Sequence, residues 1–152
     1  SSEGPAGRSP LTEFSRVVVD ASVAVSWFFP ERETEDTSRG ALELLDRIRS
    51  GAVQVLQPPH WAIEVVAVAA RVRPASVEWV ARYVEALELP IERDPEILLL
   101  AGRLARDLSA HVFDTLYHAV ALDRGATLWT ADGTYLRKSR KLGAIRPIQS
   151  FS

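Results

Sequence analysis

Residues 16–20 read RVVVD, and residues 22–29, which follow directly, read SVAVSWFF. A short β-branched run of this kind is typical of a strand buried inside a parallel sheet. The apolar stretch after it predicts a helix, which Pro30 ends. Asp20 is therefore expected at the carboxyl end of a buried strand, just before a helix.

The alternation of strand and helix patterns continues along the chain. We expect further strands at 53–56, 89–92 (a weak one), 126–129 and 145–148, and helices at 34–50, 60–73, 75–87, 95–107, 112–124 and 134–141. Strands that alternate with helices or helix pairs predict an α/β fold with a mainly parallel sheet covered on both faces. Ligands of such sheets bind outside the carboxyl ends of the strands, which draws attention to Asp20 and Asp132.

Length and composition restrict the class of protein. The 152 residues carry a formal charge of -2, and 47% of them are hydrophobic, which fits one domain, expected at 15–152. The chain contains no Cys, which excludes disulfides, thiolate nucleophiles and Cys-rich zinc sites. It also contains no Met, so we interpret residues 1–14 as a flexible leader or a remnant of processing or cloning. Without a long apolar run or a signal-like start, we expect a cytoplasmic protein with no membrane partner.

Four acids stand in settings where an acid is unusual. Asp20 and Asp132 follow expected strands, while Glu64 and Asp114 interrupt nearly apolar helical sequence. Each also has a structural explanation: a turn for Asp20, an N-cap for Asp114 and Asp132, and an ion pair or solvent contact for Glu64. His118 lies one helical turn after Asp114, and we assign it to the core in preference to the site.

The four acids together indicate a chemistry that none of them indicates alone. Four carboxylates in one crevice repel each other, and hard divalent cations such as Mg²⁺ or Mn²⁺ neutralise sites built from oxygen ligands. We therefore predict metal-assisted hydrolysis of phosphodiester bonds. A basic run just after Asp132 is the expected contact for the phosphate backbone, although such a run is also typical of a solvated helix face; it contains Arg137, Lys138, Arg140 and Lys141.

The order of these motifs resembles the PIN-domain ribonucleases, in particular the VapC-type toxins of toxin–antitoxin pairs. The resemblance runs from about residue 17 to 148 and rests on VVVDAS at 17–22, Pro59 and Glu64, FDTLYHAVA at 113–121, and TAD at 130–132. It implies a three-layer α/β/α sandwich and Mg²⁺- or Mn²⁺-dependent cleavage of RNA. It also implies a centre formed by Asp20, Glu64, Asp114 and Asp132, with Asp20 and Asp114 as metal ligands and Ser22 and Thr130 as supporting residues.

The same resemblance implies partners. Toxins of this type bind a cognate antitoxin in a helical groove, and the helix pair at 61–73 and 75–87 is the expected groove. Trp79 and Tyr83 are candidate anchors for the antitoxin, and a homodimer contact or a place in the core is an equally open interpretation of both. We also expect a homodimer. Two other functions remain open: a PIN-like protein- or RNA-binding module without activity, and a phosphatase or receiver domain. The last ranks lowest because Asp20 is followed by Ala-Ser and the only Lys residues are Lys138 and Lys141.

Overall fold

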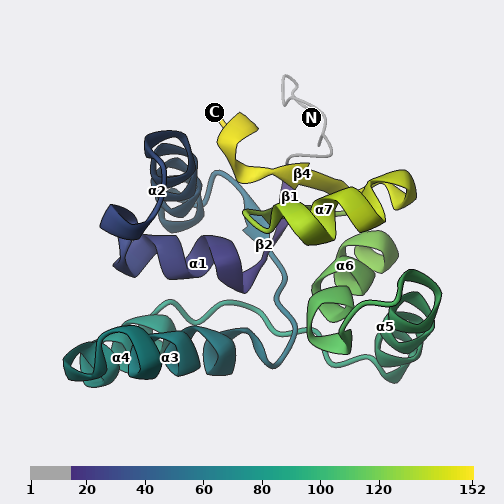
Figure 1. Cartoon of the computed structure of the whole chain (residues 1–152), viewed down its shortest axis with the longest axis horizontal. Helices are drawn as coiled ribbons and strands as arrows, with labels where there is room; N and C mark the ends of the chain where they lie inside the picture. Colours follow the sequence, from purple (N-terminus) through teal and green to yellow (C-terminus); the bar gives the residue numbers. More distant parts are fainter. Residues whose placement is uncertain (1–14) are drawn as a thin grey trace, which may run out of the picture.

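A computed structural model describes residues 15–152 and contains a four-stranded, all-parallel sheet (Figure 1). Its strands are β1 (Arg16–Val19), β2 (Gln54–Val55), β3 (Thr127–Thr130) and β4 (Ile145–Pro147), in the order β2-β1-β3-β4. In the central pair, Val18 lies opposite Leu128. Because β1 and β3 are adjacent and parallel, their carboxyl ends bring Asp20 and Thr130 to the same edge of the sheet.

Seven α-helices connect and cover the strands in this part of the chain. They are α1 (Ala21–Phe28), α2 (Glu35–Ser50), α3 (Trp61–Val72), α4 (Val77–Ala86), α5 (Pro95–Leu108), α6 (Val112–Arg124) and α7 (Gly133–Ser139). The ends of α2 follow local rules: Thr34 caps the first turn through its side chain, and Gly51 ends the helix with a φ of 80°. The helix predictions are confirmed to within a few residues.

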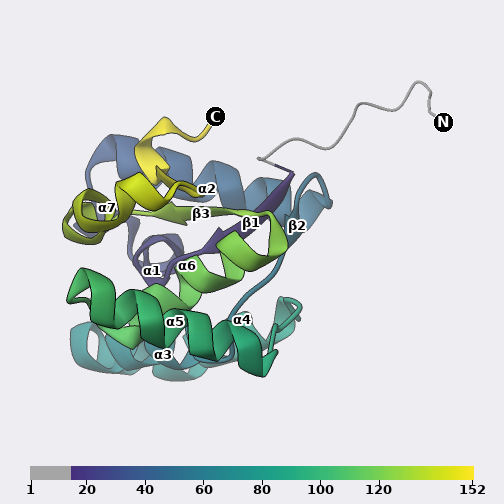
Figure 2. The ribbon, with the colours of Figure 1, turned by 90° about the vertical axis from the view of Figure 1, so that its right-hand side faces the viewer.

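Helices flank the sheet on both sides, as the α/β prediction required. Figure 2 shows α2 above the sheet, with α6, α5 and α3 below it. Helix α6 packs on β1 and β3, and α2 packs on the C-terminal segment 148–150. Gly40 allows the second contact, because a Cβ atom at this position would lie 2.1 Å from the carbonyl oxygen of Ile148.

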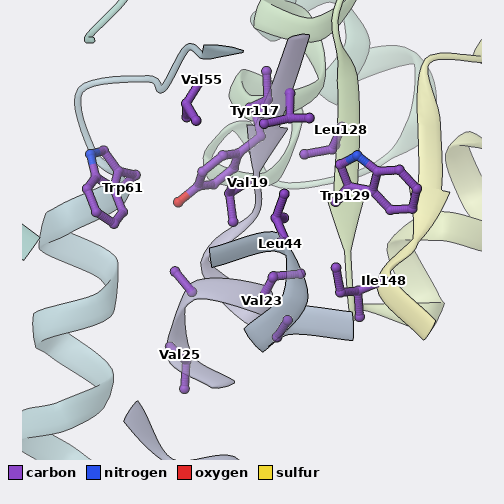
Figure 3. Close-up of a cluster of buried hydrophobic side chains, with 14 of the residues drawn as sticks. Val19, Val23, Val25, Leu44, Val55, Trp61, Tyr117, Leu128, Trp129 and Ile148 are labelled. Carbon is purple, nitrogen blue, oxygen red and sulfur yellow. The ribbon is translucent and has the colours of Figure 1, made fainter. Parts of the chain in front are cut away.

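The core forms around the β-branched strand with which the fold begins. Val17, Val18 and Val19 are fully buried, as are Leu44 and Ile148. Figure 3 shows Val19, Leu44 and Ile148 in the same cluster of side chains. Burying a Val or Leu side chain stabilises the fold by about 1.5–3 kcal/mol. The edge of the sheet that carries Asp20 is thus anchored directly to the most buried part of the protein.

One strand prediction is wrong. Residues 89–92 form no strand; they make a single parallel bridge between Ile91 and Gln57. Pro90 has no N–H to donate to the hydrogen bonds between strands. Glu88, just before the predicted strand, has a φ of 48°, so the chain enters this segment from a left-handed conformation and not from an extended one.

The remaining expectations are the leader at residues 1–14 and the absence of a membrane span. The proposed leader, residues 1–14, lies outside the residues that the structure describes. Among residues 15–152, each helix is too short or too polar to cross a bilayer.

Candidate active site

Asp20 follows β1 directly and caps the N-terminus of α1. Its Oδ2 atom accepts hydrogen bonds from the Ser22 amide (3.0 Å), the Ser22 hydroxyl and the Thr130 hydroxyl (3.4 Å). Burial raises the pKa of Asp20 from 3.8 to about 7, against the lowering effect of the Ser22 bonds. The charges of Asp114 and Glu64 raise this pKa further, so all three carboxylates lie within electrostatic reach of one another.

Ser22 and Thr130 also organise the loop that carries Asp132. The Ser22 hydroxyl accepts from the Ala131 amide at 2.9 Å, and the Thr130 hydroxyl accepts from the Asp132 amide at 3.0 Å. Asp132 in turn caps α7 by accepting from the Tyr135 amide at 3.0 Å. The capping interpretation of Asp132 is therefore confirmed, and its carboxylate still has one oxygen that is not used in the cap.

Glu64 lies in the first turn of α3, and its side chain is 30% exposed. No Arg pairs with it within residues 15–152, so of the two structural explanations the Arg pair is wrong, while contact with solvent agrees with its exposure. Its Oε1 atom instead accepts from the Tyr117 hydroxyl at 2.6 Å and lies 3.5 Å from Nε2 of His60.

Asp114 is the third residue of α6, and His111 occupies the N-cap position. The prediction that Asp114 is itself the cap is wrong, because residues 112 and 113 are already helical. Burial raises the pKa of Asp114, and the charges of Asp132 and Glu64 raise it further. Asp114 and Asp132 line one hollow of about 260 Å³.

Lys138 is the member of the basic run that lines the same hollow. Its ammonium group donates to the Ser109 carbonyl at 2.8 Å. This bond holds the positive charge of Lys138 beside Asp114 and Asp132. Arg137, Arg140 and Lys141 are exposed and do not line this hollow. Of the four basic residues, Lys138 is therefore the one that lies next to Asp114 and Asp132.

His118 belongs to the core, as expected. It is fully buried, its Nδ1 lies 2.8 Å from the Tyr135 hydroxyl, and its Nε2 lies 2.8 Å from the Gly143 carbonyl. Burial lowers its pKa. Both ring nitrogens are occupied, so His118 serves packing rather than the acids.

The four acids suit a hard divalent cation by donor type and by charge. They come from four separate elements, and Asp20 and Asp114 each have a pKa raised by neighbouring carboxylates. Among residues 15–152, no three Asp, Glu and His side chains already surround a point closely enough to hold a metal ion. Mg²⁺ in proteins commonly takes one or two carboxylates and keeps several waters, so a site of this kind does not require all four acids to converge on one point.

Sequence reasoning missed three polar residues next to this centre. Tyr117 and His60 contact Glu64, and fully buried Gln57 bonds to both backbone groups of Val19, at 2.7 and 2.9 Å. Spacing offers a signal for two of them, because His60 precedes Glu64 by one helical turn and Tyr117 follows Asp114 by three residues. Nothing local in the sequence marks Gln57.

The fold and the site define an all-parallel α/β domain whose acids gather at the carboxyl ends of its central strands. A comparison with protein families matches residues 17–141 to the PIN domain, and the chain belongs to this family. PIN domains are generally metal-dependent nucleases. No protein with a curated description matches the chain.

Proposed function

We propose that this PIN domain is an endoribonuclease that hydrolyses RNA phosphodiester bonds with Mg²⁺ or Mn²⁺. The observation that carries the proposal is the convergence of Asp20, Glu64 and Asp114, which come from different elements: burial and the nearby charge of Glu64 raise the pKa of both Asp20 and Asp114. A bound divalent cation supplies Lewis acidity and a water of lowered pKa at such a centre. Cys and Ser nucleophiles are not needed for this chemistry.

The residues of the chain have distinct proposed roles. Asp20 and Asp114 hold the cation, and Ser22 and Thr130 fix the Asp20 carboxylate by hydrogen bonds. Glu64 and Asp132 complete the acidic centre. Lys138, beside the hollow of Asp114 and Asp132, binds a phosphate of the RNA.

The exposed residues of the basic run extend this contact along the substrate. Arg137, Arg140 and Lys141 follow the RNA backbone away from the centre. Their contacts are not base-specific, so they contribute affinity rather than sequence preference.

A cleavage assay tests the proposal. Purified protein is incubated with RNA and Mg²⁺ or Mn²⁺, with and without EDTA, alongside Asp20→Asn, Asp114→Asn and the control Asp46→Asn, an exposed acid on α2. We expect cleavage that EDTA abolishes, that both site variants lose and that the control keeps. Cleavage in EDTA or by the site variants contradicts the proposal, and RNA binding without cleavage favours the binding-module alternative.

We further propose that the enzyme is the toxin of a VapBC-type pair. A hollow of about 470 Å³ between α3 and α4 is lined by Glu85 and seven apolar residues, which are Ala62, Ile63, Val66, Ala67, Ala70, Ala81 and Val84. Trp79 of α4 is 51% exposed, while Tyr83 is half-buried; both rings contact Phe28. An apolar antitoxin helix suits this groove. A basic residue on that helix could reach Glu64, because Glu64 belongs to α3, which forms one wall of the groove.

The toxin role predicts a small DNA-binding protein encoded by the neighbouring reading frame. Its product should bind the purified domain and stop RNA cleavage, and Ala67→Asp in the groove should abolish this inhibition without changing the cleavage rate. Inhibition that survives Ala67→Asp contradicts the groove, and a neighbour that neither binds nor inhibits contradicts the pairing.

We also propose a homodimer. Leu98 and Leu99 of α5 and Phe113 of α6 are large apolar side chains that are 59%, 47% and 59% exposed. Helices α5 and α6 pack together, so these side chains belong to neighbouring helices. A second copy is the proposed cover of these side chains. Light scattering should give the mass of a dimer for the wild type and of a monomer for Leu98→Glu; a monomeric wild type contradicts the proposal.

A further inference from the structure

Tyr117 lies among the acids of the candidate active site. Its side chain is fully buried, and its hydroxyl donates to Oε1 of Glu64 at 2.6 Å. Burial, together with the charges of Asp20, Glu64 and Asp114, raises the pKa of Tyr117, so the hydroxyl keeps its proton and acts as a donor. Figure 3 shows the Tyr117 oxygen directed toward the helix that begins at Trp61, which is α3.

The ring of Tyr117 is itself held in place. The His60 ring packs on it with the two centroids 4.6 Å apart, and Nε2 of His60 lies 2.7 Å from the Phe113 carbonyl. Because a carbonyl only accepts, Nε2 carries the hydrogen in this contact. His60 therefore connects the start of α3 to the start of α6 and leaves the Tyr117 ring little freedom to move.

Only one of the two carboxylate oxygens of Glu64 has side-chain contacts within residues 15–152. In the part of the chain that the structure describes, its side-chain contacts with Tyr117 and His60 both go to Oε1, and Oε2 has no protein partner. A Glu side chain that is 30% exposed has several rotamers open to it, and a single strong hydrogen bond selects among them. The hydrogen bond from the Tyr117 hydroxyl therefore favours one rotamer of Glu64.

We propose that Tyr117 is a positioning residue of the acidic centre, where its hydroxyl fixes Glu64 through Oε1 and leaves Oε2 as the oxygen that acts in RNA hydrolysis. This inference rests on the proposed nuclease function. It assigns Tyr117 no contact with RNA or with the reacting atoms, because its hydroxyl is already committed to Glu64. Displacements of about 1 Å at a reacting group cost up to about 100-fold in rate, so losing this bond should be visible in catalysis.

A double-mutant cycle tests the proposal through the turnover number. Tyr117→Phe keeps the ring and removes the hydroxyl, and we expect kcat to fall about tenfold with KM nearly unchanged. In the Glu64→Gln background, whose residual activity is measured with long incubations, Tyr117→Phe should cause no further fall. The matched control is Thr115→Val, which removes another buried hydroxyl bond of α6, the 2.7 Å bond to the Ala101 carbonyl.

The outcomes separate the possible failures. A similar fall of kcat for Thr115→Val, or the same fall for Tyr117→Phe with and without Glu64→Gln, shows a general effect of α6 and overturns the positioning role. An unchanged kcat for Tyr117→Phe also overturns it, while wild-type cleavage leaves the nuclease proposal intact. A wild-type protein that cleaves no RNA overturns the nuclease proposal first, and the positioning role with it.

Discussion

The hydroxyl oxygens of Ser22 and Thr130 lie 3.5 Å apart, and both groups donate to the same carboxylate oxygen of Asp20. Ser22 belongs to α1 and Thr130 ends β3, so two elements that are 108 positions apart in the sequence fix one acid. The parallel pairing of β1 with β3 makes this meeting possible. Asp20 is therefore held in place from two sides, by the first turn of α1 and by the end of β3.

Removing either hydroxyl should weaken both catalysis and the fold. Ser22→Ala and Thr130→Val each take one donor from Asp20 and one acceptor from the backbone of 131–132, so we expect kcat/KM to fall by about 10-fold or more. The free energy of unfolding should fall by about 1–3 kcal/mol. Cleavage kinetics and urea unfolding measure the two effects. Ser50→Ala, whose hydroxyl bond is exposed, is the control, and equal losses of activity in all three variants would contradict the prediction.

Asp20 should make the metal-free protein less stable as the pH rises. Its pKa is about 7 in the folded protein, above the ordinary value of 3.8, so folding favours the protonated form. The stability that this protonation contributes is present below about pH 4 and is lost as the pH rises through about 7. Asp20→Asn, which carries no charge, should thus melt several degrees above the wild type in EDTA at about pH 8, and the difference should shrink at about pH 5. A difference that does not change with pH would refute this.

Lys138 should contribute more to RNA binding than a basic residue far from the acids. We expect Lys138→Ala, measured in an Asp20→Asn background that prevents cleavage, to weaken RNA binding and to reduce the salt slope by about 0.7 for the lost phosphate contact. The matched control is Arg39→Ala on α2, where the guanidinium pairs with exposed Asp36. Fluorescence anisotropy at several salt concentrations gives both slopes. Identical slopes for the two variants would argue against a phosphate contact at Lys138.

Gln57 should be important for stability. Its amide bonds to the N–H and the C=O of Val19, the residue before Asp20, and therefore continues the pairing of β1 beyond the end of β2. Gln57→Leu leaves both backbone groups buried and unpaired, and the free energy of unfolding should fall by about 2–4 kcal/mol. Gln54→Leu, at an exposed position of β2, should change it by less than about 0.5 kcal/mol. Urea unfolding of the two variants measures this difference, and equal effects would contradict it.

The sequence was informative where structure follows from local patterns. The helix at 112–124 was predicted with its observed ends, because a periodic apolar face stops at Gly125, which ends α6 with a φ of 63°. The strand prediction at 89–92 failed because it gave the apolar pattern more weight than Pro90, which has no N–H to donate, and because the sequence does not show the left-handed conformation of Glu88.

In the candidate site, too, some features could be predicted from local sequence patterns and others could not. The acids after β1 and β3 were recognisable because parallel strands share a carboxyl edge. The bond between Tyr117 and Glu64 was not, since it joins residues 53 positions apart on two helices whose relative placement depends on the whole core. The separation of Lys138 from Arg137, Arg140 and Lys141 likewise depends on where α7 packs against the loop that carries Ser109.

Binding of Mn²⁺, measured by calorimetry, tests most directly whether the four acids form a cation site. The wild type should bind Mn²⁺ at millimolar concentration or below, Asp20→Asn and Asp114→Asn should lose this binding, and Asp46→Asn on the surface of α2 should retain it. A wild type that takes up no Mn²⁺ at millimolar concentration, or binding that neither site variant reduces, would contradict a metal centre at the carboxyl edge of this sheet.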